Sequence, residues 1–129
     1  MTIFEAAIEL TKKDATLLSV DDIDKKYNGD IGKAYGALYE EALAKLFKEY
    51  GTTDKQAEIE ISDDVIGYQL TTMKIYREQK GMNQTELAEA VGISQSEISS
   101  YESGVKSPRV NVAVAIAEVL GVTIGELVN

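Results

Sequence analysis

Apolar residues recur every three or four positions along most of the chain, which is the spacing of one face of an α-helix. The pattern is longest from Ile31 to Tyr50. One face of this segment holds Tyr35, Leu38, Tyr39, Ala42, Leu43, Leu46 and Phe47. Shorter amphipathic segments follow Thr2 and Ser19, and each has an acid three positions after that residue, as in a capping box. We therefore expect the first half of the chain to be helical.

A break in the helical pattern separates the two halves. Residues 57–62 alternate between apolar and polar as a strand does, but the stretch is short, and we interpret it as the joint between the halves. Ser62-Asp63-Asp64 then has the composition of a helix start. We expect one helix over residues 63–80. Its buried side would hold Ile66, Leu70, Met73 and Tyr76.

The second half shows a rapid alternation of helix starts and stops. Capping-box tetrads begin at Asn83, Ser94 and Thr123, and Ser107-Pro108 joins an N-cap residue to the proline favoured at the first helical position. The glycines at the expected helix ends are Gly81, Gly92, Gly104 and Gly121. The predicted helices are 63–80, 84–91, 95–102, 108–120 and 124–128. Because such short helices are unstable alone, they must share a core. The core candidates are Leu87, Ala88, Val91, Ile93, Ile98, Val112, Ile116, Leu120 and Leu127.

Two of these helices meet at a sharp corner. Gly92-Ile93-Ser94 joins them, and a glycine permits the positive φ that a tight turn between helices needs. Ala88 is small enough for the helices to cross closely, while Leu87 and Ile98 would pack inside the corner. This is the arrangement of a helix-turn-helix motif, whose second helix enters the major groove of DNA.

The residues around this corner follow a known order and spacing. They are Arg77, Gly81, Gln84, Leu87-Ala88, Val91-Gly92, Ser94-Gln95, Ile98-Ser99, Glu102, Gly104, Pro108, Ala117, Leu120-Gly121-Val122 and Glu126-Leu127. Through them, residues 70–128 resemble the phage-repressor and Cro type of helix-turn-helix domain, the Xre family. The resemblance implies a five-helix domain that binds double-stranded operator DNA, commonly as a two-fold dimer on a near-palindromic site. We thus expect an all-α protein, with this domain at residues 69–129 and a small acidic helical region at residues 1–68.

The resemblance also implies roles for individual residues. Those expected at base edges are Gln95, Ser96, Ser99 and Ser100. Those expected at the DNA backbone are Asn83, Gln84, Lys106 and Arg109. The amide of Gln95 would pair with N6 and N7 of adenine, and Gln84 would also brace the reading helix. Arg77 and Glu102 would form a partly buried ion pair with a structural role.

The charge distribution limits how strongly this protein can hold DNA. The net charge is −9, and residues 1–68 hold 8 lysines and 15 acids, whereas residues 69–129 hold 5 basic and 7 acidic residues. Residues 95–102 contain no Lys or Arg. Non-specific DNA binding comes from cations placed on phosphates. We therefore expect weak non-specific binding, modest affinity per monomer and a reliance on dimerisation.

The composition excludes several kinds of chemistry. With no Cys and no His, the chain has no disulfide, no thiol nucleophile, no ordinary zinc site and no histidine-based catalysis. The acid pairs Asp21-Asp22 and Asp63-Asp64 stand at helix starts, and no phosphate-binding glycine loop is present. We expect no catalytic residue, no metal, no cofactor and no membrane span, and a cytoplasmic location.

The first half leaves several roles open. The helix over 31–50 has more apolar face than 68 residues can cover, so a second copy could cover it in a homodimer. Alternatively, this half could bind a toxin, sense a small ligand or stabilise the second half. Its tyrosines at positions 27, 35, 39 and 50 fit a core or an interface better than a ligand pocket. We expect a sequence-specific transcriptional regulator, and repression rather than activation, because repression needs only occupancy of a promoter. The competing functions are an antitoxin that regulates its own operon, with the N-terminal region bound to the toxin, and a protein-interaction module.

Overall fold

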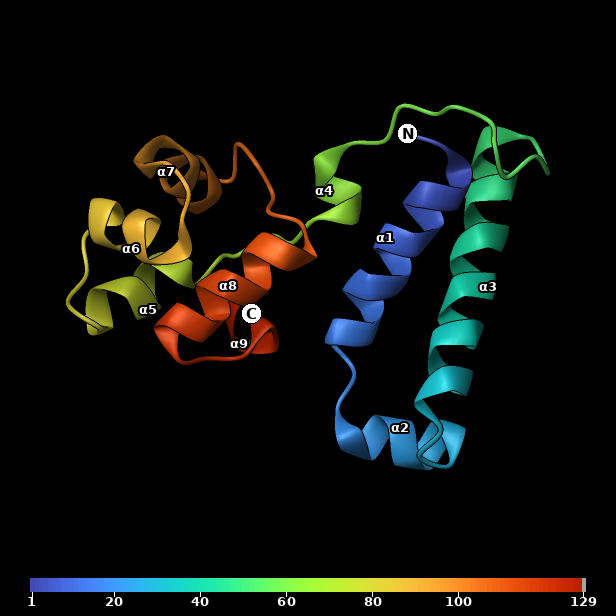
Figure 1. Cartoon of the computed structure of the whole chain (residues 1–129), viewed down its shortest axis with the longest axis horizontal. Coiled ribbons are helices and arrows are strands. Elements are labelled where there is room, and N and C mark those ends of the chain that lie inside the picture. The colour runs from blue at the N-terminus through green and yellow to red at the C-terminus, as the bar shows by residue number, and fades with distance from the viewer. Residues whose placement is uncertain (129) are drawn as a thin grey trace. The chain divides into compact units, whose positions relative to one another are not determined.

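The computed structural model describes residues 1–128, and every regular element in that range is an α-helix (Figure 1). The predicted all-α class is confirmed. Internal contacts divide the chain into two units, Met1–Ile66 and Gly67–Asn129. Each unit buries a hydrophobic core of its own.

The first unit contains the helices α1 (Ile3–Thr16), α2 (Val20–Tyr27), α3 (Ile31–Tyr50) and α4 (Asp63–Ile66). The chain runs along α1, turns through α2 and returns along α3, so that α1 and α3 lie side by side (Figure 1). Both helices bury alanines, whose small side chains take little space between two packed helices. The residues buried between them include Ile3, Ala6, Ala7, Ala42, Leu43 and Leu46.

Complete capping boxes begin the first two helices, as their sequences predict. In the first, the Glu5 backbone N–H donates to the Thr2 hydroxyl, and the Thr2 backbone N–H donates to the Glu5 carboxylate. The hydrogen bonds from the Thr2 backbone and hydroxyl lower the pKa of Glu5. Ser19 and Asp22 form the same reciprocal pair at the start of α2. These local bonds satisfy N–H groups that the first turn of a helix leaves unpaired.

Residues 57–62 do not form a joint between the halves, and that prediction is wrong. Ile59 is buried in the core of the first unit, and its N–H donates to the Met1 carbonyl at 2.8 Å. The Ile3 N–H likewise donates to the Ala57 carbonyl at 3.0 Å. The segment therefore belongs to the first unit because its apolar side chain is buried there and its backbone pairs with the N-terminus.

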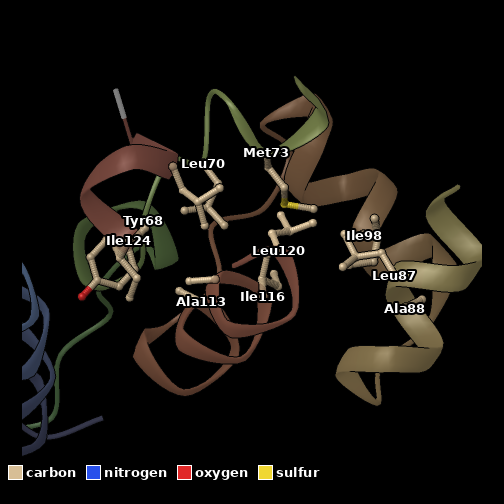
Figure 2. Packing of buried hydrophobic residues seen from close by; sticks show 12 residues of the cluster. Tyr68, Leu70, Met73, Leu87, Ala88, Ile98, Ala113, Ile116, Leu120 and Ile124 are labelled. Carbon is tan, nitrogen blue, oxygen red and sulfur yellow. The ribbon is translucent and has the colours of Figure 1, made fainter. Parts of the chain in front are cut away.

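The second unit contains the helices α5 (Met73–Gln79), α6 (Gln84–Val91), α7 (Gln95–Ser103), α8 (Val110–Leu120) and α9 (Ile124–Val128). Side chains from all five helices contribute to one core. Figure 2 shows Met73, Ile116 and Leu120 pointing toward one another, with Leu87 and Ile98 beside them. None of these helices is long enough to be stable alone, so the shared core holds them together.

The single helix predicted over residues 63–80 is wrong, because residues 67–72 are not helical. The Tyr68 N–H donates to the Pro108 carbonyl at 2.9 Å, and the Thr72 N–H donates to the Leu127 carbonyl at 3.2 Å. Tyr68 is almost completely buried. Backbone bonds to distant segments and the burial of Tyr68 thus replace the helical bonds that the apolar spacing predicted.

The predicted start of the fourth helix of this unit is also wrong. The helix begins at Val110, with Arg109 rather than Ser107 as its N-cap residue. Ser107 is buried, and its hydroxyl accepts a hydrogen bond from Gln69 Nε2 at 2.7 Å. Ser107 therefore bridges to the segment before α5 instead of capping α8.

The corner glycine gives a direct test of this fold. Gly92 ends α6 with φ +86°, a left-handed conformation that costs an alanine about 1–2 kcal/mol. Because an added Cβ would meet no atom within 4 Å, we expect Gly92→Ala to destabilise the protein by about that backbone cost alone. Gly125, inside α9, is the matched control: Gly125→Ala should stabilise by up to about 1 kcal/mol. Urea unfolding followed by circular dichroism compares the two, and an equal effect of both substitutions would contradict the strained corner.

Candidate nucleic-acid interface

The corner between α6 and α7 is built from short-range contacts. The Gly92 and Ile93 N–H groups both donate to the Ala88 carbonyl, at 2.8 and 3.0 Å. Ser94 then begins α7, and its hydroxyl accepts a hydrogen bond from the Glu97 N–H. The polypeptide thus leaves α6, turns within three residues and enters α7 with a capped N-terminus.

One buried residue fixes which face of α7 points outward. Ile98 is completely buried beneath the helix, in contact with the core of the unit. Gln95 and Ser96 are exposed, and Ser99 and Ser100 are half-buried on the same helix. The four residues expected at base edges therefore keep accessible surface on a single helix. Whether they contact DNA stays a prediction.

A chain of four polar side chains connects the buried side of this unit to the exposed start of α7. Gln95 Nε2 donates to Gln84 Oε1 at 2.6 Å, and Gln84 Nε2 donates to Glu102 Oε2 at 2.6 Å. Arg77 Nε donates to Glu102 Oε1 at 2.6 Å. The chain thus joins α5, α6 and α7 and ends at the amide of Gln95.

Burial increases along this chain from Gln95 to the ion pair. Gln95 is exposed and Gln84 is half-buried, whereas the side chains of Arg77 and Glu102 are 9% and 5% exposed. Arg77 is further held by Nη1, which donates to the Met82 carbonyl at 2.7 Å. A charge-assisted pair in such surroundings needs hydrogen bonds on both partners, and both have them here.

The remaining residues expected at the DNA backbone lie at two places. Asn83 caps α6, where its side-chain oxygen accepts the Glu86 N–H at 2.8 Å. Lys106 and Arg109 are exposed on the segment between α7 and α8. No other basic residue comes between residues 84 and 120, so these two side chains are the exposed cations near the corner in sequence.

The hydrogen bond between Gln84 and Glu102 is the contact that sequence reasoning missed. The resemblance paired Glu102 with Arg77 and assigned Gln84 to phosphate and to the reading helix. No periodic signal links positions 84 and 102, because they lie on different helices on either side of the corner. Only the folded structure brings the two side chains together.

The first unit carries an apolar groove along the surface between α1 and α3. The groove has a volume of about 370 Å³ and is lined by Ile8, Thr11, Lys12, Tyr35, Gly36 and Tyr39. Phe4 stacks edge-to-face on Tyr39 with ring centroids 6.4 Å apart, and 40% of its surface is exposed. The helix α2, which connects α1 and α3, buries none of its residues. The first unit therefore leaves apolar surface exposed along α1 and α3.

Two features bear on other kinds of site. Among residues 1–128, no group of three or more acidic residues is placed to hold a metal ion. Within that same range, no helix has the length and apolarity needed to cross a membrane.

The buried ion pair predicts a large effect on stability. Replacing Arg77 by Met leaves the Glu102 carboxylate buried without its cation, and we expect a loss of about 3–5 kcal/mol. Lys74→Met is the control, because Lys74 and Glu78 are 4.0 Å apart and well exposed, and such pairs contribute about 0–1 kcal/mol. Chemical unfolding of both variants measures the difference. Similar losses in the two would show that burial does not determine the strength of the pair.

The comparisons with known proteins agree with this geometry. Residues 73–127 match the helix-turn-helix family. The chain is 34% identical, over 53 residues, to the cryptic phage CTXphi transcriptional repressor RstR of Vibrio cholerae. This aligned segment makes up 41% of the chain. The chain thus spans about half (48%) of the length of that relative. No solved structure gives a significant match. Residues 73–127 are therefore an Xre-type helix-turn-helix domain.

Proposed function

We propose that this protein is a sequence-specific DNA-binding transcriptional regulator that represses by occupying an operator. The observation that carries the proposal is the exposed start of α7, where Gln84 holds the amide of Gln95. An amide held at the start of a reading helix pairs well with an adenine edge in the major groove. The similarity to the repressor RstR supports the same function. As a reader of DNA, the protein would act in the cytoplasm.

We further propose that it binds a near-palindromic operator as a homodimer. One Gln–adenine pair discriminates by only about 1–3 kcal/mol, and α7 has no Lys or Arg to add phosphate contacts. Two copies would read half-sites about 34 Å apart and combine their binding energies. The first unit has apolar surface for such an interface, since Tyr35 is 48% exposed and Ile31 is 58% exposed.

A second candidate function is that of an antitoxin that represses its own operon. The observation that favours it is the uncovered groove between α1 and α3, in a unit that carries much of the chain's acidity. A basic toxin with an apolar patch would fit such a surface. Both candidates need the same DNA-binding domain and differ in what the first unit binds.

The first test is binding to DNA from upstream of the protein's own gene. We expect fluorescence anisotropy at two salt concentrations to show tighter binding to this DNA than to a scrambled duplex. The salt slope should be modest, because few cations face the phosphates. Equal binding to both duplexes, or none to either, would argue against an operator in that region. A randomised duplex library then decides whether the protein selects any sequence.

Two substitutions separate base contact from phosphate contact. Gln95→Ala should weaken binding to the preferred duplex by about 5- to 150-fold per half-site and leave the scrambled duplex unaffected. Lys106→Ala should weaken both duplexes by the same factor and reduce the salt slope by about 1 per copy. Anisotropy titrations of both variants on both duplexes provide the comparison. Gln95→Ala acting equally on both duplexes would exclude Gln95 from base recognition.

A further inference from the structure

We propose that Glu102, whose buried side chain cannot itself read DNA, determines which purine Gln95 prefers. This inference rests on the proposed function, because it concerns the base that α7 reads. It assigns to Glu102 a positioning role in addition to its ion pair with Arg77. The support comes from the direction of the hydrogen bonds in the chain from Glu102 through Gln84 to Gln95.

The direction of these bonds follows from the chemistry of the carboxylate. An ionised carboxylate only accepts hydrogen bonds, so the group that Gln84 turns toward Glu102 must be its NH₂. The Nε2–Oε2 distance is 2.6 Å. The carbonyl of the same amide is then left to face Gln95, which must donate its own Nε2, again at 2.6 Å. One acceptor-only group at the buried end therefore orients both amides.

The oriented amide of Gln95 has a defined set of free groups. One of its two N–H bonds is used on Gln84, which leaves its carbonyl oxygen and one N–H for a ligand. In the major groove, adenine offers the N6 amino donor and the N7 acceptor. These two groups match a free carbonyl and a free N–H.

Guanine fits the opposite orientation of the two glutamine amides. Its major-groove edge offers two acceptors, O6 and N7, and a free carbonyl facing O6 would be repelled. If these hydrogen bonds ran in the opposite direction, the Gln95 carbonyl would accept a hydrogen bond from Gln84. Both N–H bonds of Gln95 would then be free to donate to O6 and N7 of guanine. Choice between the purines thus depends on which way the two amides point.

Neither glutamine fixes this direction by itself. A primary amide can turn about its terminal bond, and in either orientation it can form a hydrogen bond with another amide. Arg77 cannot supply the direction either, because a guanidinium only donates and contacts Glu102 rather than Gln84. Glu102 is the acceptor-only group in contact with Gln84, and it is held in place by burial and by Arg77.

The test reverses the hydrogen bond between positions 84 and 95 while it keeps Glu102 paired. Gln84→Lys places a donor-only ammonium between Glu102 and Gln95, so the carboxylate stays satisfied and Gln95 must turn its carbonyl inward. At the base pair read by Gln95, we expect the unsubstituted protein to prefer adenine over guanine by at least about fivefold. The Gln84→Lys variant should prefer guanine instead. The added charge should strengthen binding to all duplexes alike, and it cancels in the ratio of affinities. Gln84→Met, which neither donates nor accepts usefully, should reduce the preference to within about twofold.

The experiment uses the full chain and selection from a randomised duplex library, followed by anisotropy on duplexes that differ at one base pair. The base pair read by Gln95 is the one whose preference disappears in Gln95→Ala. Circular dichroism confirms that each variant folds, and Gln84→Met decides the matter if Gln84→Lys does not fold.

The outcomes separate this inference from the proposed function. Selection of no motif by the unsubstituted protein would end the proposed function and this inference with it. A motif with guanine at the Gln95 position would overturn the inference alone. Adenine preference that survives both Gln84→Lys and Gln84→Met would also overturn it, while leaving the protein a DNA-binding regulator.

Discussion

The buried carboxylate of Glu102 is the constraint on which the arrangement of the exposed start of α7 depends. A charge removed from water is tolerated only where it is paired and hydrogen-bonded. Arg77 from α5 and Gln84 from α6 satisfy its two oxygens, so three helices must meet at one point. Packing of apolar residues such as Ile98 brings α7 close to the core, but apolar contact is not directional. The hydrogen bonds among Arg77, Glu102, Gln84 and Gln95 are directional. They therefore orient α7 against α5 and α6 and hold the side chain of Gln95 in place.

The shortage of positive charge bears on how binding energy would be divided at the proposed DNA interface. Where many cations face the phosphates, every duplex is bound and base contacts add a difference. Here α7 has no cation of its own and the net charge of the protein is negative, so we expect weak non-specific binding. Discrimination by a few oriented groups is then a larger share of the total binding energy. If Gln95 contacts a base, its geometry would then matter more than the modest energy of one contact suggests.

Local features are predictable from the sequence, and long-range ones are not. The capping boxes and the left-handed Gly92 depend on residues within a few positions of each other, so the amino-acid pattern alone locates the α6–α7 corner. The loss of helix at residues 67–72 depends on a bond from Tyr68 to Pro108, which is far away in the chain. The pattern around Ile59 predicts a joint, although its N–H donates to the Met1 carbonyl. Residues near Ile59 in the sequence carry no signal of this long-range bond. The contact between Gln84 and Glu102 crosses the corner in the same way.

The first unit completes the argument, because its surface joins apolar side chains to a high density of acids. If a second copy covers the face that holds Phe4 and Tyr35, like charges meet around an apolar centre. Salt screens that repulsion, with a Debye length of about 8 Å at physiological ionic strength, and leaves the apolar contact intact. Salt weakens the contacts with phosphate at the same time. Association of the first units and binding of DNA by the second would therefore respond to salt in opposite directions, and the salt dependence of DNA binding by such a dimer would be moderate.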